Sequence, residues 1–166
     1  MAIFLAIPIL GVLVIFQSAI LSNINLLHGS ADLVLLVLVA WAVQERVKTA
    51  WHWAVIGGLL VSLVSAMPLA AILAGYLAST GTALLLRRAF WQRPLFAMIA
   101  GTFAGTIILH AISILTLRLL DTPLPLIESL NQVTLPSALL NLLLAIPIYA
   151  VIGDVASWVY PVEIEM

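Results

Sequence analysis

The side chains in this sequence that could do chemistry begin with His110 and Ser113. The two residues lie three positions apart in an apolar stretch, so they share one face of a helix. A histidine beside a serine could act as a base next to a nucleophile. The sequence has no HExxH, GxSxG or P-loop pattern to support an enzyme. We therefore interpret Ser113 as a helix-packing residue and His110 as bonded to a backbone carbonyl, and we predict no catalytic residue; an intramembrane hydrolase or acyltransferase using His110 is the least favoured hypothesis.

Metal, thiol and nucleic-acid chemistry are not indicated. The chain has no cysteine, which excludes disulfides and thiolate ligands. The scattered histidines, together with Asp32 and Asp154, do not have the spacing of metal ligands. The net charge is −1, whereas a nucleic-acid partner requires a basic face. We predict no metal site, no cofactor and no nucleic-acid partner.

Three polar residues within or beside apolar segments are the candidate intramembrane contacts: Gln17, Asp32 and Asn141. Polar groups are costly in a bilayer and often mark function. An amide can also bond across helices, for about 1 kcal/mol or less. For Gln17 and Asn141 the sequence leaves two interpretations open, a polar cluster facing a partner or ligand and a bond between helices, and it favours the second. We expect Asp32 at a helix N-terminus, where its carboxylate meets the positive end of the helix dipole.

The composition predicts that these residues are held by membrane helices. Of 166 residues, 64% are hydrophobic and 8% are charged, and the mean hydropathy is +1.26. Soluble domains carry roughly 25% charged residues. The sequence therefore predicts an all-α polytopic membrane protein, a bundle of about six transmembrane helices in one integral membrane domain covering residues 1–166. The expected spans are residues 2–21, 32–47, 51–66, 69–86, 95–120 and 136–155.

Two of these segments need comment. Segment 2–21 lacks the positive n-region of a secretory signal, so we interpret it as a retained first span. Segment 32–47 has about 12 apolar residues, which gives a helix of roughly 18 Å. It spans the membrane only if residues 44–48 continue the helix; a re-entrant or strongly tilted segment is the alternative. Residues 121–135 have one apolar face and are expected to form a short helix in the interface plane.

The distribution of basic residues predicts the orientation. The loops 44–50 and 87–94 hold five of the six Lys and Arg residues. Basic loops stay in the cytoplasm, so six spans place both termini in the cytoplasm. The five tryptophans fall near the same ends of the segments, as expected of an aromatic belt at the interface.

Small residues four positions apart predict close helix packing. The uncharged stretch 57–79 is broken once, at Met67-Pro68, and we expect it to be the packing centre of the bundle. Small faces let helix backbones approach closely in lipid. The candidate residues for helix packing or a partner interface are Gly57, Gly58, Ala71, Gly75, Tyr76, Ser79, Ala97, Gly101 and Gly105.

The sequence resembles the family of the bacterial rod shape-determining protein MreD over most of its length. The matches, in order, are Gln17-Ser18, Ala31-Asp32 before a long apolar run, Gly58-Leu59-Leu60, Met67-Pro68-Leu69, Gly75-Tyr76-Leu77, Arg87-Arg88, and Pro136, Asn141 and Tyr149 in the last span. One departure is Ser62, which stands where many members carry an aspartate, so any function tied to that carboxylate is in doubt.

The resemblance implies a non-catalytic scaffold of the cell-elongation and peptidoglycan-synthesis machinery in the bacterial plasma (inner) membrane. The implied partners, besides membrane lipids, are MreC and, through it or directly, the RodA polymerase, its transpeptidase and the MreB filament. The alternative is the substrate-binding S component of an energy-coupling-factor vitamin transporter, a class whose fold resembles that of MreD. A vitamin site needs several converging polar groups, and the loops opposite the basic ones offer few.

Overall fold

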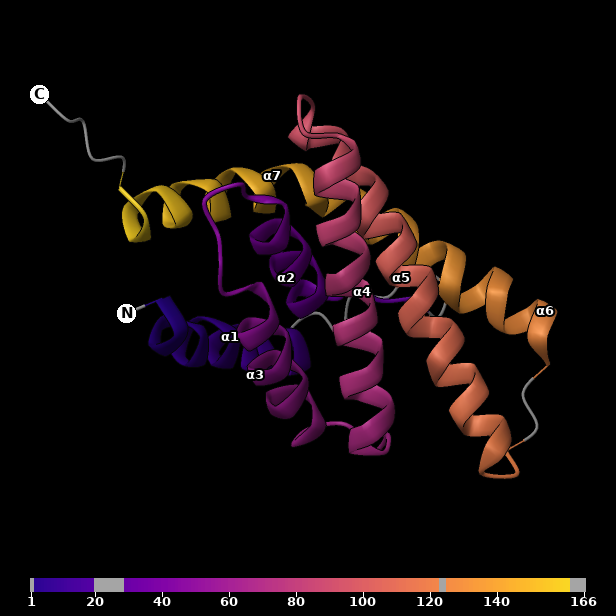
Figure 1. Cartoon of the computed structure of the whole chain (residues 1–166). Helices are drawn as coiled ribbons and strands as arrows, with labels where there is room; N and C mark the ends of the chain where they lie inside the picture. The colour runs from indigo at the N-terminus through magenta and orange to yellow at the C-terminus, as the bar shows by residue number, and fades with distance from the viewer. Residues whose placement is uncertain (1, 20–28, 123–124, 162–166) are drawn as a thin grey trace, which may run out of the picture.

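The computed structural model describes residues 2–19, 29–122 and 125–161 (Figure 1). Every element in these ranges is helical, which confirms the predicted all-α class. The elements are α1 (Ala2–Ala19), α2 (Leu33–Val43), α3 (Ala50–Ser62), α4 (Leu69–Ala89), α5 (Pro94–Leu119), α6 (Leu126–Ser129), the π-helical turn η2 (Leu130–Thr134) and α7 (Leu135–Val159).

The described part of the chain contains four helices that are long and apolar enough to cross a membrane. They are α1, α4, α5 and the continuous helix formed by α6, η2 and α7 over Leu126–Val159. The predicted membrane protein is therefore confirmed. Residues 126–134 extend the last helix, and the short separate helix expected within 121–135 is not formed there. The other two helices, α2 and α3, have 11 and 13 residues.

The centre of the bundle is α2, which differs from the expectation that the 57–79 hairpin would occupy it. All of its 11 residues are buried, and it packs against α1, α3, α4, α5 and α7. Its sequence is apolar on every side, which is typical of a helix enclosed by others. Figure 1 shows α2 enclosed in this way, and the hairpin of α3 and α4 forms one wall around it.

α2 also ends earlier than the sequence predicts. The helix stops at Val43, Gln44 has an extended backbone, and residues 44–49 are not helical. The Arg87 guanidinium of α4 accounts for this end, because its Nη1 donates to the carbonyls of Gln44 at 2.9 Å and Val47 at 3.3 Å. At 1.5 Å per residue α2 is roughly 16 Å long, about half the hydrocarbon thickness. It is therefore too short to cross the membrane.

α4 holds α2 at both ends. Tyr76 of α4 donates to Asp32 at the start of α2, at 2.9 Å, and Arg87 reaches the carbonyls at its end. The two helices run parallel, and the 11 positions from Tyr76 to Arg87 on α4 match the 11-residue length of α2. A carboxyl group at the start and a guanidinium at the end both complement the helix dipole. α4 therefore fixes the position of α2 along the bundle axis.

Replacing Arg87 with methionine should lower the free energy of unfolding by about 2 kcal/mol, the size of a lost hydrogen bond to a charged group. The change keeps an apolar stem and removes the donors to Gln44 and Val47. Arg88→Met is the matched control, because Arg88 is exposed and should change stability by less than about 0.5 kcal/mol. Unfolding in mixed micelles, followed by circular dichroism, measures both. Equal effects of the two substitutions would contradict the role of Arg87.

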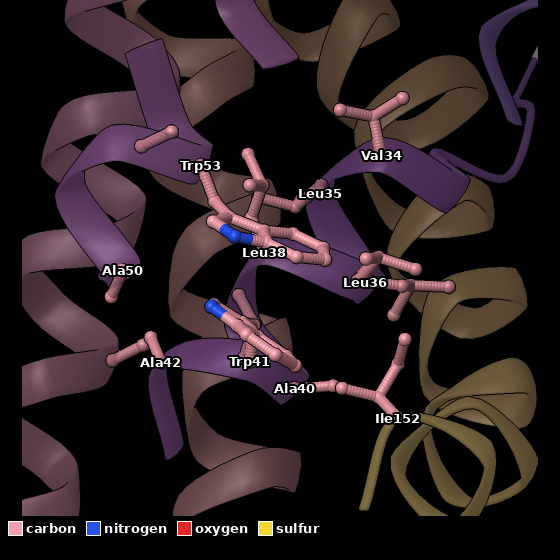
Figure 2. Packing of buried hydrophobic residues seen from close by; sticks show 14 of the residues in the cluster. Val34, Leu35, Leu36, Leu38, Ala40, Trp41, Ala42, Ala50, Trp53 and Ile152 are labelled. Atoms are coloured by element: carbon pink, nitrogen blue, oxygen red, sulfur yellow. The ribbon is translucent and has the colours of Figure 1, made fainter. Parts of the chain in front are cut away.

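A tryptophan pair closes the end of the bundle where α2 stops. Figure 2 shows Trp53 of α3 lying over Trp41 of α2, with ring centroids 4.1 Å apart and planes 19° from parallel. Trp53 Nε1 donates to the Ala2 carbonyl at 3.0 Å. Trp41 Nε1 donates to Thr49 Oγ1, which bonds to the Tyr160 hydroxyl. One end of the bundle therefore brings together the starts of α1 and α3 and the ends of α2 and α7.

We call this the basic end, because the loop residues Arg46, Lys48 and Arg93 and the last turn of α4, with Arg87 and Arg88, also lie there. The expectation that all five tryptophans form an interface belt is wrong for Trp41 and Trp53. Both are fully buried, because their large rings fill the space where the short helices end. Trp51, Trp91 and Trp158 are exposed, as residues of such a belt would be.

α1 and α7 flank an apolar cleft, whereas the other walls around α2 are closed by direct helix contacts. The cleft has a volume of about 710 Å³. Its floor is Leu33 and Val37 of α2. Its sides include Pro8 and Val12 of α1 and Leu144 and Val151 of α7, and we refer to it as the α1–α7 cleft.

Candidate functional site

The candidate site is a buried polar network at the start of α2. The first amides of a helix have no partner within the helix, and inside a membrane bundle the protein itself must bond them. Gln17 Oε1 accepts from the amides of Leu33 at 2.8 Å and Val34 at 3.4 Å. Asp32 Oδ1 accepts from the Leu35 amide at 2.9 Å. The first three amides of α2 are thus all paired with side chains.

Asp32 connects this helix start to two further helices. Its second carboxyl oxygen accepts from the Tyr76 hydroxyl of α4 at 2.9 Å. Its backbone amide donates to Asn141 Oδ1 of α7 at 2.8 Å. Asp32 therefore caps its own helix, as predicted for its place at the positive end of the dipole, and it also links α4 and α7 to that helix.

Asn141 carries the network on into α5. Its Nδ2 donates to Thr106 Oγ1 at 2.9 Å, and the Thr106 hydroxyl donates to the Thr102 carbonyl at 2.8 Å. Asn141 and Thr106 are almost fully buried. With Gln17 from α1, the network joins five helices, which are α1, α2, α4, α5 and α7.

Comparisons with known proteins add no function to this geometry. No family model, curated protein or solved structure matches the chain. The meaning of the network must come from its own contacts. Gln17 Oε1, both carboxyl oxygens of Asp32 and both amide atoms of Asn141 each bond to another part of the protein. These contacts favour a bond between helices over a ligand site.

The segment that leads into α2 lies tightly against α7. Gly29 is buried, and a Cβ atom placed on it would lie 2.6 Å from the Ser137 nitrogen and 2.9 Å from the Val133 oxygen. The Ser30 amide donates to Ser137 Oγ at 3.1 Å. Only a residue without a side chain allows this approach.

The π-helical turn η2 lies next to this segment. The Leu135 amide bonds to the Leu130 carbonyl, five residues back. Pro136 follows and has no amide hydrogen, and its ring would collide with the carbonyl four residues earlier in a regular helix. The wider turn accommodates the proline without breaking the helix. Turns of this kind are frequent at functional sites.

The predicted packing residues lie inside the bundle. Cβ atoms on Gly75, Gly101 and Gly105 would touch Leu109, Val39 and Leu35, respectively. Ser79 Oγ donates to the Gly105 carbonyl at 3.0 Å. The others follow the same pattern: Gly57, Gly58, Tyr76 and Ala97 are buried, and Ala71 is half-buried. Gly75, Ser79, Gly101 and Gly105 bring α2, α4 and α5 together, and Gly57 and Gly58 of α3 face α2 and α4.

His110 and Ser113, both of which the structure describes, do not bond to each other. The Ser113 hydroxyl donates to the Leu109 carbonyl at 2.9 Å, as a packing serine would. His110 Nδ1 lies 3.1 Å from Thr134 Oγ1, so its partner is a hydroxyl group and not the expected backbone carbonyl. The residues described also contain no group of three His, Cys, Asp or Glu side chains that could hold a metal ion.

Sequence reasoning missed some members of the network. Thr102, Thr106 and Ser137 were not expected to take part, and Tyr76 was expected only at a packing face. The four-residue spacing of Thr102 and Thr106 places both hydroxyls on the same side of the helix, which was an available signal. Nothing in the sequence pairs that side with Asn141. Ser62 lies outside the network, and its hydroxyl donates to the Leu59 carbonyl at 2.6 Å.

Proposed function

We propose that this chain is a non-catalytic membrane scaffold of the bacterial cell-elongation machinery, as its resemblance to the MreD family implies. The supporting observation is the network at the start of α2. Gln17, Asp32, Tyr76 and Asn141 come from four separate segments that carry the resemblance, and they lie in one set of hydrogen bonds. Residues that match the MreD family in separate parts of the sequence should come together in this way if the chain shares the fold of that family.

A scaffold of this kind needs a surface for the transmembrane helix of a partner. The rows of small residues on α4 and α5 are buried against each other and against α2, so they do not offer one. The α1–α7 cleft is concave, lined only by apolar residues, and reaches the central helix. An apolar helix laid in such a groove gains van der Waals contact along its length. We assign this cleft to the single membrane helix of MreC; RodA, its transpeptidase and MreB are recruited through MreC or directly.

The proposed location is the bacterial plasma membrane, with the basic end in the cytoplasm. Arg88 and Arg93 are exposed at that end, and short basic loops stay in the cytoplasm. Ala2 and Tyr160 lie at the same end, bonded to Trp53 and Thr49. These contacts support a cytoplasmic location for both ends of the described chain, on the side of the MreB filament, with lipids over the remaining apolar surface.

Filling the α1–α7 cleft should abolish capture of the partner. We expect Val12→Trp and Val151→Trp, each made at a wall of the cleft, to reduce recovery of MreC in co-purification at least tenfold. Leu115→Trp is the matched control, because Leu115 is 59% exposed on α5 and lies outside the cleft. Full recovery of MreC with both cleft variants would contradict this docking surface, and no recovery with the unmodified chain would contradict the scaffold role.

The S-component alternative makes a different prediction for the same experiment. It requires co-purification of paired ATPases and a bound vitamin. None of the residues lining the α1–α7 cleft offers a polar side chain, so the cleft gives a vitamin nothing to bond to. Recovery of both the ATPases and a vitamin would select the transporter over the scaffold.

A further inference from the structure

A second cavity lies between α5 and the π-helical turn, apart from both the network and the α1–α7 cleft. It has a volume of about 360 Å³. Apolar side chains from both helices line it, including Leu109, Ile114 and Val133. The same wall carries His110, Ser129 and Thr134. We call it the His110 crevice.

Thr134 holds one ring nitrogen of His110. The Thr134 oxygen lies 3.1 Å from His110 Nδ1, and either group can be the donor. Among the described residues nothing bonds to the other ring nitrogen, Nε2. In a neutral histidine Nε2 carries either a hydrogen or a lone pair, and a hydroxyl group can bond to it in both cases because it can donate or accept.

We propose that the His110 crevice binds the hydroxyl-bearing end of an uncharged lipid, such as a diacylglycerol, with the lipid hydroxyl bonded to His110 Nε2. The apolar lining takes the adjoining part of an acyl chain, in the manner of sites that combine an apolar wall with a few placed polar groups. This assignment does not depend on the scaffold role.

The chemistry of the crevice favours an alcohol over a phosphate group. A phosphate is bound by Arg, Lys or clusters of backbone amides. The residues lining the crevice include neither Arg nor Lys. An alcohol can bond to His110 Nε2 without bringing a charge into the crevice, whereas a phosphate brings a charge that no lining residue balances. A fully esterified glyceride has no hydroxyl group for this bond.

The position of His110 also suits a lipid entering from the bilayer. His110 lies nine residues before the end of α5 at Leu119, which is roughly 14 Å along the helix. α5 has 26 residues, so it is roughly 9 Å longer than the hydrocarbon core when upright. The imidazole is therefore placed a short way below the membrane surface that lies opposite the basic end.

The test is binding of defined lipids to the full chain in nanodiscs, measured by native mass spectrometry. We expect dioleoylglycerol to bind in a 1:1 ratio, and trioleoylglycerol and dioleoyl phosphatidic acid to bind at least tenfold more weakly. His110→Phe should lower binding of dioleoylglycerol at least tenfold. His110→Gln retains an acceptor oxygen and should keep most of the binding. His52→Phe is the control, because His52 is exposed on α3.

Three results would overturn the assignment: equal binding of dioleoylglycerol and trioleoylglycerol, preference for phosphatidic acid, or unchanged binding by His110→Phe. If His110→Phe fails to fold, Ile114→Trp decides the question. That substitution fills the crevice and leaves the imidazole in place, so it should also abolish binding. Unchanged binding by Ile114→Trp would place the lipid elsewhere on the protein.

Discussion

Replacing Asp32 with alanine is expected to lower the free energy of unfolding by about 4 kcal/mol, one of the two largest effects of a single substitution in this chain. The change leaves the Leu35 amide and the Tyr76 hydroxyl without their partner. Each buried group left unpaired costs about 1–3 kcal/mol, and a lost helix cap contributes about 1 kcal/mol for the amide. Unfolding in mixed micelles, followed by circular dichroism, measures the effect.

Asp32→Asn separates the role of the cap from that of the charge. Asparagine keeps an oxygen for the Leu35 amide and an amide group near Tyr76, so we expect a loss of only about 1 kcal/mol. Tyr76→Phe and the double variant with Asp32→Ala complete a cycle, in which the coupling of two contacting residues is about 0.5–3 kcal/mol. A stability of Asp32→Ala equal to that of the unmodified chain would show that the network does not hold α2.

Gly29→Ala should be comparably severe, with a loss of about 3 kcal/mol or more, the upper range for overpacking. The new methyl group would lie 2.6 Å from the Ser137 nitrogen, 2.7 Å from Pro136 Cβ and 2.9 Å from the Val133 oxygen. Two of these are backbone atoms of a helix, so the segment before α2 must move away. That movement breaks the bond from the Ser30 amide to Ser137. Unfolding in mixed micelles, followed by circular dichroism, also measures the loss of stability of Gly29→Ala.

Gly11→Ala is the matched control within the same chain. A Cβ atom on Gly11 of α1 would meet nothing within 4 Å. Alanine is favoured over glycine in a helix by about 1 kcal/mol, so this variant should be as stable as the unmodified chain or more stable. If the two alanine variants behave alike, the close approach of Gly29 to α7 is not present in the folded protein.

The membrane class and the helical fold could be predicted because they follow from composition and from the length of apolar runs. The break at Met67-Pro68 also reads correctly as a boundary, because Leu69 begins α4. Pro136 does not, because it lies within the continuous helix Leu126–Val159. Burial could not be predicted, because in lipid an apolar residue on the surface and one in the core look alike. This is why α2 was expected to be a marginal span and is the centre of the bundle.

The sequence could predict which residues belong to the candidate site, but it could not predict which groups they bond to. Gln17, Asp32 and Asn141 stand out because polar groups are costly in a bilayer. Their convergence depends on α2 being short, which places its first amides inside the bundle. The end of α2 depends in turn on Arg87, 43 residues from Gln44. A contact over that distance leaves no periodic signal in a sequence.

The pairing of Asp32 with Asn141 has a consequence for how the protein is made. The Asp32 amide bonds to a side chain 109 residues later, on α7, which leaves the ribosome long after α2. Until that helix has entered the bilayer, the start of α2 lacks one of its partners, and α2 by itself is too short for stable insertion. Membrane integration of α2 is therefore completed only after translation of α7, and chains truncated before residue 141 should be targets for membrane quality-control proteases.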